Sequence, residues 1–279
     1  MRAVLLIERL SAATGETMLL RDVTLDVAAG EVHGLVGMSG AGKSMIAKAV
    51  LGVLPAAVRI TSGSIRFEGT EIVNLPHTKM RQLLARGIAL IPQDPLSALN
   101  PTRRIEHQMT DVMRDRLGLS ATAARNRALA LLDEVQVREP KSVLRRFPHE
   151  VSGGQRQRIL IAIAFALEPR LIIADEPTTA LDVTVQKQIL RLIDDLRRRH
   201  GTAILFVTHD LGVVAKICDR ISVMHAGVIL EQGTVADVIA APRHAFTRAL
   251  FAAIPRHDRP NQELRSVPDA LQHTVSVLR

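Results

Sequence analysis

The chain has 279 residues, 47% of them hydrophobic, which is ample for a large domain with a buried core. Its longest apolar run, residues 159–167, is much shorter than the roughly 18 residues that span a bilayer. The apolar stretch at the start is too short for a secretory signal, so we expect a cytoplasmic protein. The single cysteine, Cys218, excludes an intramolecular disulfide and a cysteine-rich metal cluster.

A formal net charge of +8 would suit a nucleic-acid partner, but the basic residues are scattered along the chain. The one arginine run, residues 197–199, ends a helix-like segment, where cations favour the helix dipole. Six Phe and no Tyr or Trp leave no aromatic platform for stacking bases. We therefore expect no nucleic-acid ligand.

In chain order, the first elements read as strands. Apolar segments at residues 3–7 and 23–27 flank a turn at 14–16, and a third apolar segment at 32–37 runs directly into a glycine-rich loop. Residues 44–54 after that loop have the composition of a helix. The order strand, glycine loop, helix is typical of phosphate-binding α/β proteins.

The rest of the chain alternates between strand and helix patterns, so the fold class is α/β. A helical segment is expected at 75–87, and residues 100–144 have helical spacing throughout, with Ala128, Leu131 and Val135 on one face. Near-continuous apolar runs favour parallel strands that are covered on both faces. The expected strands are 64–66, 88–93, 171–175 and 203–209, followed by a hairpin at 221–233.

Residues 37–44, GMSGAGKS, match the P-loop pattern G-x-x-x-x-G-K-[ST] between a strand and a helix. Glycines let backbone N–H groups converge on phosphates, Lys43 adds a point charge, and the Ser44 hydroxyl is suited to Mg²⁺. The pattern predicts ATP and Mg²⁺ as cofactors. The residues expected to contact the nucleotide are Gly37, Ser39, Gly40, Ala41, Gly42, Lys43, Ser44 and Met45.

Polar side chains end three of the expected strands. Asp175 is placed to hold Mg²⁺ through water, and Glu176 is placed to polarise the attacking water as a general base. A histidine at a strand end is usually structural, but beside a P-loop His209 could bond the γ-phosphate and hold the water in line. Gln93 ends another strand and could contact Mg²⁺ or the γ-phosphate, so it is also a metal-site candidate.

A second glycine-rich turn, SGGQ at residues 152–155, precedes the apolar helical segment QRQRILIAIAFAL. Its N–H groups and the helix dipole form an anion site. One nucleotide needs only one P-loop, so this turn either has another purpose or closes on a nucleotide held by another molecule. The second possibility implies a dimer. The residues are Ser152, Gly153, Gly154 and Gln155.

In this order and spacing, GMSGAGKS, IPQDP, VSGGQRQR, LIIADEPTTALD and FVTHD resemble the nucleotide-binding subunit of an ABC transporter. The likeness covers about residues 3–250. It implies a RecA-like P-loop NTPase core with an antiparallel β subdomain and a helical subdomain at about 100–168. It also implies a head-to-tail dimer in which each ATP lies between one subunit's P-loop and the other's SGGQ turn. The roles carried over are nucleotide contact for Ser152, Gly153 and Gln155, and a place at the dimer seam for Leu181 and Asp182, of which Asp182 is also expected to contact the nucleotide. Gln93 would couple to the membrane subunits, and His209 would be the switch histidine.

The same resemblance sets the expected organisation and partners. Residues 1–250 would form the ATPase domain, and residues 251–279 a partly ordered C-terminal extension. The partners would be two membrane permease subunits, a second ATPase subunit that is either a copy or a paralogue, and indirectly an extracytoplasmic solute-binding protein. The protein would then lie peripherally on the cytoplasmic face of the inner membrane.

Two local strings, FPHE at 147–150 and HAFTR at 244–248, are similar to ATPases of dipeptide, oligopeptide and nickel importers. We expect a peptide importer ATPase; the alternatives are a nickel or other small-solute importer and a non-transport ABC ATPase. Two departures stand out. No aromatic residue lies near Thr14, where the family stacks adenine, so selectivity for ATP over GTP is less secure. Many peptide-importer ATPases also have a C-terminal segment with several cysteines that resembles an iron–sulfur site, whereas the tail of this chain contains no cysteine.

Overall fold

The computed structural model describes residues 3–179 and 181–252, which divide into two compact units. The first unit contains the described residues up to Leu5, Val27–Gly30 and Asn74–Phe206. The second contains Leu6–Asp26, Glu31–Val73 and the described residues from Val207 on. All but the first two residues of the expected C-terminal extension lie outside the described part of the chain.

The second unit carries most of a four-stranded sheet with the order β2-β1-β4-β5, while the first residues of β1, up to Leu5, and the last two of β2 belong to the first unit. The strands are β1 (Ala3–Thr14), β2 (Thr17–Ala28), β4 (Val58–Phe67) and β5 (Thr70–Glu71). The expected segments 3–7, 23–27 and 64–66 are therefore too short. Arg9 and Asp22 have φ values of 46° and 48°, and such irregular positions break the alternation from which strands are read.

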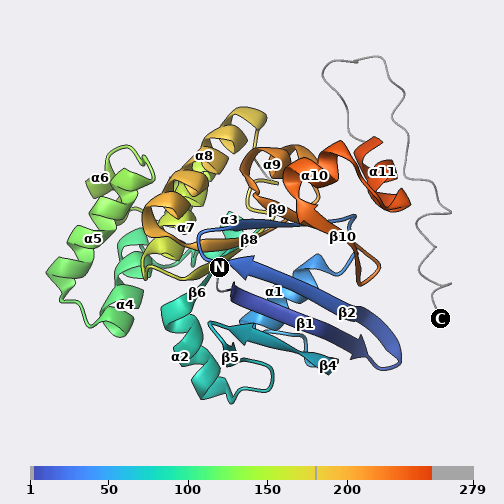
Figure 1. The fold of residues 1–279 in the computed structure, drawn as a ribbon. Helices are drawn as coiled ribbons and strands as arrows, with labels where there is room; N and C mark the ends of the chain where they lie inside the picture. Colours follow the sequence, from blue (N-terminus) through green and yellow to red (C-terminus); the bar gives the residue numbers. More distant parts are fainter. Residues whose placement is uncertain (1–2, 180, 253–279) are drawn as a thin grey trace. The chain divides into compact units, whose positions relative to one another are not determined.

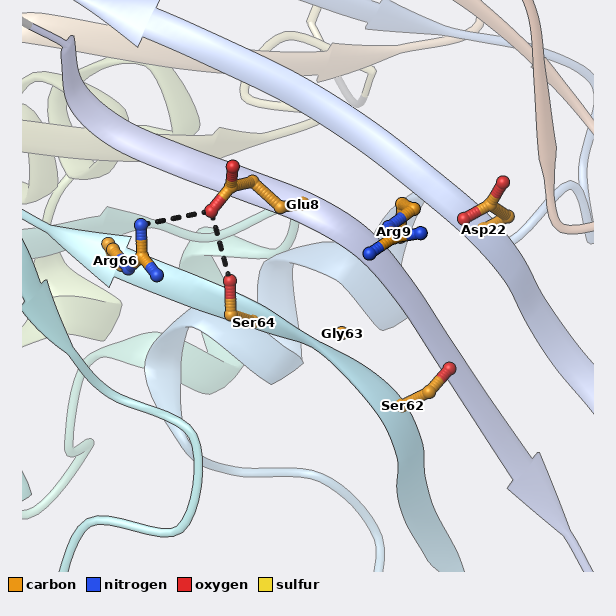
Figure 2. Close-up of a pocket in the computed structure, with 7 residues that line it drawn as sticks. All are labelled: Glu8, Arg9, Asp22, Ser62, Gly63, Ser64 and Arg66. Carbon is orange, nitrogen blue, oxygen red and sulfur yellow. Dashed lines mark hydrogen bonds and ion pairs between the residues drawn. The ribbon is translucent and has the colours of Figure 1, made fainter.

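A polar hollow of about 570 Å³ lies over this sheet. Figure 2 shows Glu8 of β1 reaching toward Ser64 and Arg66 of β4. The Glu8 carboxylate accepts a hydrogen bond from the Ser64 hydroxyl at 3.3 Å and pairs with Arg66 at 3.1 Å. Because Glu8 and Arg66 are both nearly half exposed, this ion pair contributes little to stability.

The second unit also holds β3 (Val32–Val36), which pairs in parallel with β9 (Arg220–His225). Strand β9 turns into antiparallel β10 (Val228–Thr234), so the predicted closing hairpin is confirmed. Its helices are α1 (Lys43–Leu51), α9 (Leu211–Ile217), α10 (Val235–Ala240) and α11 (Ala245–Ala252). Phe246 of α11 is buried in a core with residues of β3, β9, α9 and α10, and the partly buried Cys218 packs against it.

In the first unit, β8 (Ala203–Thr208), β7 (Leu171–Asp175) and β6 (Ile88–Ile91) are neighbouring strands, and the last two residues of β8 belong to the second unit. Strands β6 and β7 run in parallel, with Ile91 opposite Ala174. The parallel arrangement predicted from the apolar runs is thus confirmed for this pair. This register places the residues after β6 and those after β7 at the same edge.

Helices make up most of the rest of the first unit. Helices α4 (Ile105–Leu117), α5 (Ala121–Glu134) and α6 (Pro140–Arg145) pack on one another (Figure 1). The predicted face of Ala128, Leu131 and Val135 is buried. No helix in the described residues is long and apolar enough to cross a membrane. The helices are α2 (His77–Gly87), α3 (Pro95–Ala98), α4 (Ile105–Leu117), α5 (Ala121–Glu134), α6 (Pro140–Arg145), a 3-10 turn (Pro148–Glu150), α7 (Gly153–Phe165) and α8 (Val183–His200).

Candidate phosphate-binding and hydrolytic site

The P-loop connects β3 to α1 in the second unit. Gly40 and Gly42 have φ values of 79° and 103°, a region in which glycine is not strained. Gly42 is the N-cap of α1 and makes no side-chain cap, so the first N–H groups of the helix point toward the loop without a capping oxygen. Such a terminus is suited to a phosphate.

Lys43 lies within this loop and is only 6% exposed. Its Nζ donates to the carbonyl oxygens of Gly37 at 2.9 Å and Met38 at 3.0 Å. The two carbonyls hold the ammonium group against the loop, where it adds positive charge to the phosphate site. Ser44, the next residue, is exposed.

The tip of the β9–β10 hairpin supports the P-loop from behind. The Gly227 N–H donates to the Ala41 carbonyl at 2.9 Å, and the Gly227 carbonyl accepts from the Arg21 N–H at 2.9 Å. Gly227 has a φ of 82°, and a Cβ there would lie 2.4 Å from the Leu19 carbonyl oxygen. Only glycine fits this contact, so the hairpin fixes the shape of the loop.

His209 directly follows β8 and is exposed. The turn around it is built by its neighbours: the Asp210 N–H donates to the Thr208 hydroxyl at 3.0 Å, and the Asp210 carboxylate caps α9 by accepting from the Gly212 N–H at 2.8 Å. This cap holds the turn while leaving the imidazole at the surface. His209 belongs to the second unit, as do all the predicted P-loop residues, Gly37, Ser39, Gly40, Ala41, Gly42, Lys43, Ser44 and Met45.

The first unit brings Gln93 and Glu176 together at the end of β6 and β7. The Gln93 Nε2 donates to the Glu176 Oε2 at 3.0 Å, and the Thr179 hydroxyl donates to the same oxygen at 3.1 Å. The parallel register explains the first contact. Ile91, the last residue of β6, pairs with Ala174 of β7, and Gln93 and Glu176 each lie two residues beyond that pair. Two donors on one carboxylate oxygen fix the orientation of the Glu176 side chain.

The backbone of Glu176 has a φ of 47°, in the left-handed region that non-glycine residues seldom adopt. Backbone conformations of this kind cost of order 1–3 kcal/mol and collect at functional sites. Asp175, the last residue of β7, is partly buried after four fully buried residues. The left-handed backbone at Glu176 therefore directly follows the end of β7 at Asp175.

Ser152 and Gln155 form a reciprocal capping box at the start of α7. The Ser152 hydroxyl accepts from the Gln155 N–H at 3.3 Å, and the Gln155 Oε1 accepts from the Ser152 N–H at 3.0 Å. Gly153 and Gly154 supply the N–H groups of the first turn, which have no partner within an α-helix. A Cβ on Gly153 would meet nothing within 4 Å, so the turn faces open space.

A hollow of about 810 Å³ adjoins this turn, with Arg138 and Arg158 among the residues that line it. Arg158 donates to the Val135 carbonyl at 2.7 Å and to the Gln188 Oε1 at 3.1 Å. Burial lowers the pKa of its guanidinium, which nevertheless remains protonated at any physiological pH. Two cations beside a helix N-terminus make this a favourable region for an anion.

Asp182 lies in the first unit as the N-cap of α8. Its carboxylate accepts from the Thr184 N–H at 3.0 Å and the Val185 N–H at 2.9 Å. A helix cap of this kind explains the residue within one subunit. Its expected place at a dimer seam, like that of Leu181, therefore remains a prediction.

The predicted metal ligands have the chemistry that Mg²⁺ requires. Ser44, Asp175 and Gln93 offer a hydroxyl, a carboxylate and an amide oxygen, all of them hard donors. Gln93 uses its amide nitrogen for the bond to Glu176, and the oxygen that would ligate a cation is not part of that bond. The chemistry of each residue therefore suits an Mg–nucleotide; Ser44 belongs to the second unit and Gln93 and Asp175 to the first.

Two residues that the sequence analysis missed hold the loop after β7. Thr179 bonds the Glu176 carboxylate, and the buried Gln157 of α7 donates from its Nε2 to the Pro177 carbonyl at 2.7 Å. A signal for Gln157 was present, because it lies three and four residues before Leu160 and Ile161, on an otherwise apolar helical face. Thr179 follows a candidate base by three residues, and nothing in its spacing singled it out.

Comparison with known proteins places the chain in a family. The family described as ABC transporter matches residues 20–179. The probable D,D-dipeptide transport ATP-binding protein DdpD of Escherichia coli is 46% identical over 91% of this chain and 78% of that protein. The oligopeptide transport ATP-binding protein OppD of Salmonella typhimurium is 44% identical over 91% of this chain and 76% of its own length.

Solved structures of similar fold support the same family assignment. The structure of cbiO1 from Clostridium perfringens, described as part of an ABC transporter complex, has a TM-score of 0.76 at 26% identity and covers 86% of this chain and 92% of that one. A bacterial ABC transporter cassette solved as a dimer has a TM-score of 0.73 at 25% identity, covering 83% of this chain and 98% of that one. The fold is that of an ABC ATPase nucleotide-binding domain, and the chain belongs to the ABC transporter ATP-binding proteins, in the family that contains the oligopeptide and dipeptide transport members.

Proposed function

We propose that this chain is the ATP-hydrolysing subunit of a bacterial ABC importer that takes up dipeptides or oligopeptides through separate permease subunits. The observation that carries the proposal is the identity of 43–46% to dipeptide and oligopeptide transport ATP-binding proteins over about nine-tenths of the chain. The FPHE and HAFTR strings point to the same group. As part of such a complex the chain would lie on the cytoplasmic face of the inner membrane.

The chemistry follows from the side chains at the site. Glu176 is the general base that takes a proton from the attacking water, because its carboxylate is held in one orientation by Gln93 and Thr179. Lys43 and the N-terminus of α1 bind the phosphates, and exposed His209 contacts the γ-phosphate. Mg²⁺, held by Ser44, Asp175 and Gln93, would neutralise phosphate charge.

The SGGQ turn is the reason for proposing a dimer. Its first-turn N–H groups and the adjoining Arg138 and Arg158 form an anion site that opens to solvent. In a head-to-tail dimer, Ser152, Gly153, Gly154 and Gln155 of one subunit would bind the nucleotide on the P-loop of the other. The second subunit is either a copy of this chain or a paralogue.

Replacement of Glu176 by Gln tests the base assignment. The amide keeps the shape of the side chain but takes no proton, so turnover should fall by about 100-fold or more while ATP still binds. The ATP-bound dimer should then accumulate, which size-exclusion chromatography with light scattering would detect. Turnover at the wild-type rate in the Glu176→Gln protein would contradict the assignment.

The proposed cargo needs a separate experiment. The chain, its permease subunits and the solute-binding protein would be reconstituted in vesicles, and ATP turnover and uptake measured with di- and oligopeptides and with Ni²⁺. Peptides should stimulate both, and Ni²⁺ should stimulate neither. Stimulation by Ni²⁺ alone would assign the transporter to a different solute while leaving the ATPase chemistry in place.

A further inference from the structure

Gln157 is the buried amide of α7, only 1% exposed, on a helix face that is otherwise apolar. An amide in such surroundings is costly unless it is hydrogen-bonded. Its Nε2 donates to the Pro177 carbonyl oxygen at 2.7 Å, which is a short bond for a neutral pair. The bond joins the helix that begins with the SGGQ turn to the loop that follows β7.

The acceptor of this bond is directly next to Glu176. Pro177 has no N–H group, so its carbonyl is the only backbone polar atom through which this residue can be held. Glu176 itself has a left-handed backbone, which persists only when surrounding contacts fix it. Gln93 and Thr179 hold the Glu176 carboxylate, and Gln157 holds the carbonyl of the next residue, in the peptide group between Pro177 and Thr178.

We propose that Gln157 is a positioning residue for hydrolysis, which holds the Glu176 loop in its strained conformation from the SGGQ helix. It touches neither the nucleotide nor the water. The capping box of Ser152 and Gln155 starts one turn earlier on the same helix, so a single rigid element joins the SGGQ turn to the base. The inference rests on the proposed role of Glu176 as general base.

A matched control lies at the other end of β7. Thr202 is also 1% exposed, and its hydroxyl donates to the Pro169 carbonyl at 2.9 Å. Each residue is therefore a buried side-chain donor to a proline carbonyl that flanks the same strand. Thr202→Val and Gln157→Met remove these hydrogen bonds with little change of volume, but only the Gln157 bond lies beside Glu176.

The two variants would be compared in the full chain. Both should lower the thermal midpoint of unfolding, since each leaves a buried carbonyl without its donor. Gln157→Met should lower kcat about tenfold or more and change the KM for ATP less than about twofold, because a small displacement of the base affects the chemical step. Thr202→Val should keep kcat within about twofold of wild type.

Amide hydrogen exchange gives a readout besides activity. Exchange over residues 175–179 should speed up in Gln157→Met and stay as in wild type in Thr202→Val. If Gln157→Met does not fold cooperatively, Gln157→Asn serves instead, since it keeps an amide in the site but is one methylene too short to reach Pro177. The same loss of kcat is expected.

Wild-type kcat and exchange in a folded Gln157 variant would overturn the positioning role. So would an equal loss of kcat in Thr202→Val, because the effect would then be one of general stability. Glu176→Gln separates this inference from the proposed function: if that variant loses turnover while Gln157→Met does not, only the positioning role fails. If Glu176→Gln turns over normally, the base assignment fails first.

Discussion

At the scale of single residues, Glu31, His33 and Ser222 form a buried relay in the second unit. The His33 Nε2 lies 2.7 Å from the Ser222 Oγ, and its Nδ1 lies 3.2 Å from the Glu31 Oε1. The order serine, histidine, carboxylate is also that of hydrolytic triads. Here His33 and Ser222 are fully buried, so no substrate can reach the hydroxyl, and the relay instead ties β3 to β9.

Ser222→Ala should therefore destabilise the protein without affecting catalysis. The change leaves one nitrogen of the buried His33 ring without its partner, which costs about 1–3 kcal/mol of unfolding free energy. Chemical denaturation measures the loss, and kcat should stay within about twofold of wild type. Ser64→Ala is the control: that hydroxyl bonds the half-exposed Glu8, and its removal should cost less than about 0.5 kcal/mol. Equal losses of unfolding free energy in the two variants would show that burial does not set the cost of removing the hydroxyl.

The sequence could predict individual site residues because their chemistry is local. Lys43 and Ser44 lie within one loop, and Glu176 follows a strand whose apolar run is unmistakable. The contacts that orient Glu176 could not be predicted in the same way. Gln93 lies 83 residues away and Gln157 lies 20 residues before Pro177, so only the folded register brings them into reach.

At the scale of elements, Asp26 of β2 and Arg220 of β9 join two strands of the second unit through a two-pronged ion pair. The Asp26 oxygens lie 2.8 Å and 3.1 Å from the two terminal guanidinium nitrogens. Hydrogen bonds from Arg220 lower the pKa of the Asp26 carboxyl below its ordinary value of 3.8. A carboxyl with a lowered folded-state pKa stabilises the protein above its ordinary pKa and loses that contribution as pH falls through the folded-state value.

Asp26→Asn should therefore weaken the fold at pH 7 and flatten its acid dependence. The difference from wild type in unfolding free energy should be constant above about pH 5 and shrink below pH 3.8. Because Asp26 is 41% exposed, solvent screening limits the difference to about 1 kcal/mol or less. Denaturant titrations from pH 2.5 to 7 would measure it. Arg220→Gln should remove the same pH-dependent part, and an unchanged acid dependence in both variants would rule the pair out as its source.

Elements were predictable where their pattern was regular. The expected strands at 171–175 and 203–209 match β7 and, to within one residue, β8, since parallel strands covered on both faces are apolar throughout. Strands β1 and β2 are 12 residues long each, and the expected segments covered only part of them. The irregular backbone at Arg9 and Asp22 shifts which side chains face the core, and an alternating pattern cannot be followed across such positions.

At the scale of the whole molecule, the residues that we propose bind phosphate are divided between the units. The second unit carries the P-loop and His209, and the first carries Gln93, Glu176 and the SGGQ turn. Each chain thus provides two candidate anion sites of different construction, a lysine-bearing loop and a capped helix start flanked by arginines. If a dimer joins the P-loop of one copy to the SGGQ turn of the other, the two sites of one chain serve different nucleotides.

Two variants, one with a damaged P-loop and one with a damaged SGGQ turn, should then restore ATP hydrolysis when they are mixed. Lys43→Ala removes the ammonium from the P-loop. Gly153→Asp places a carboxylate at the first position of α7. The side chain has open space there and is stabilised by the helix dipole, so the variant should fold. Its negative charge should repel phosphate. Each variant alone should hydrolyse ATP poorly, whereas a mixed dimer has one site with an intact P-loop and an intact SGGQ turn.

In an equal mixture, half of the dimers are mixed and each has one intact site of two, so ATP turnover should recover to about a quarter of the wild-type rate. The assay compares each variant alone, the mixture, and a mixture of Lys43→Ala with Glu176→Gln. This second mixture should not recover. In its mixed dimer, the only intact P-loop belongs to the chain whose own base is missing. In the proposed mechanism, Glu176 acts on the nucleotide of its own subunit, so neither site of this dimer is complete. No recovery in the first mixture, with dimers present by light scattering, would contradict the shared site, and recovery in both would place the base on the opposite chain.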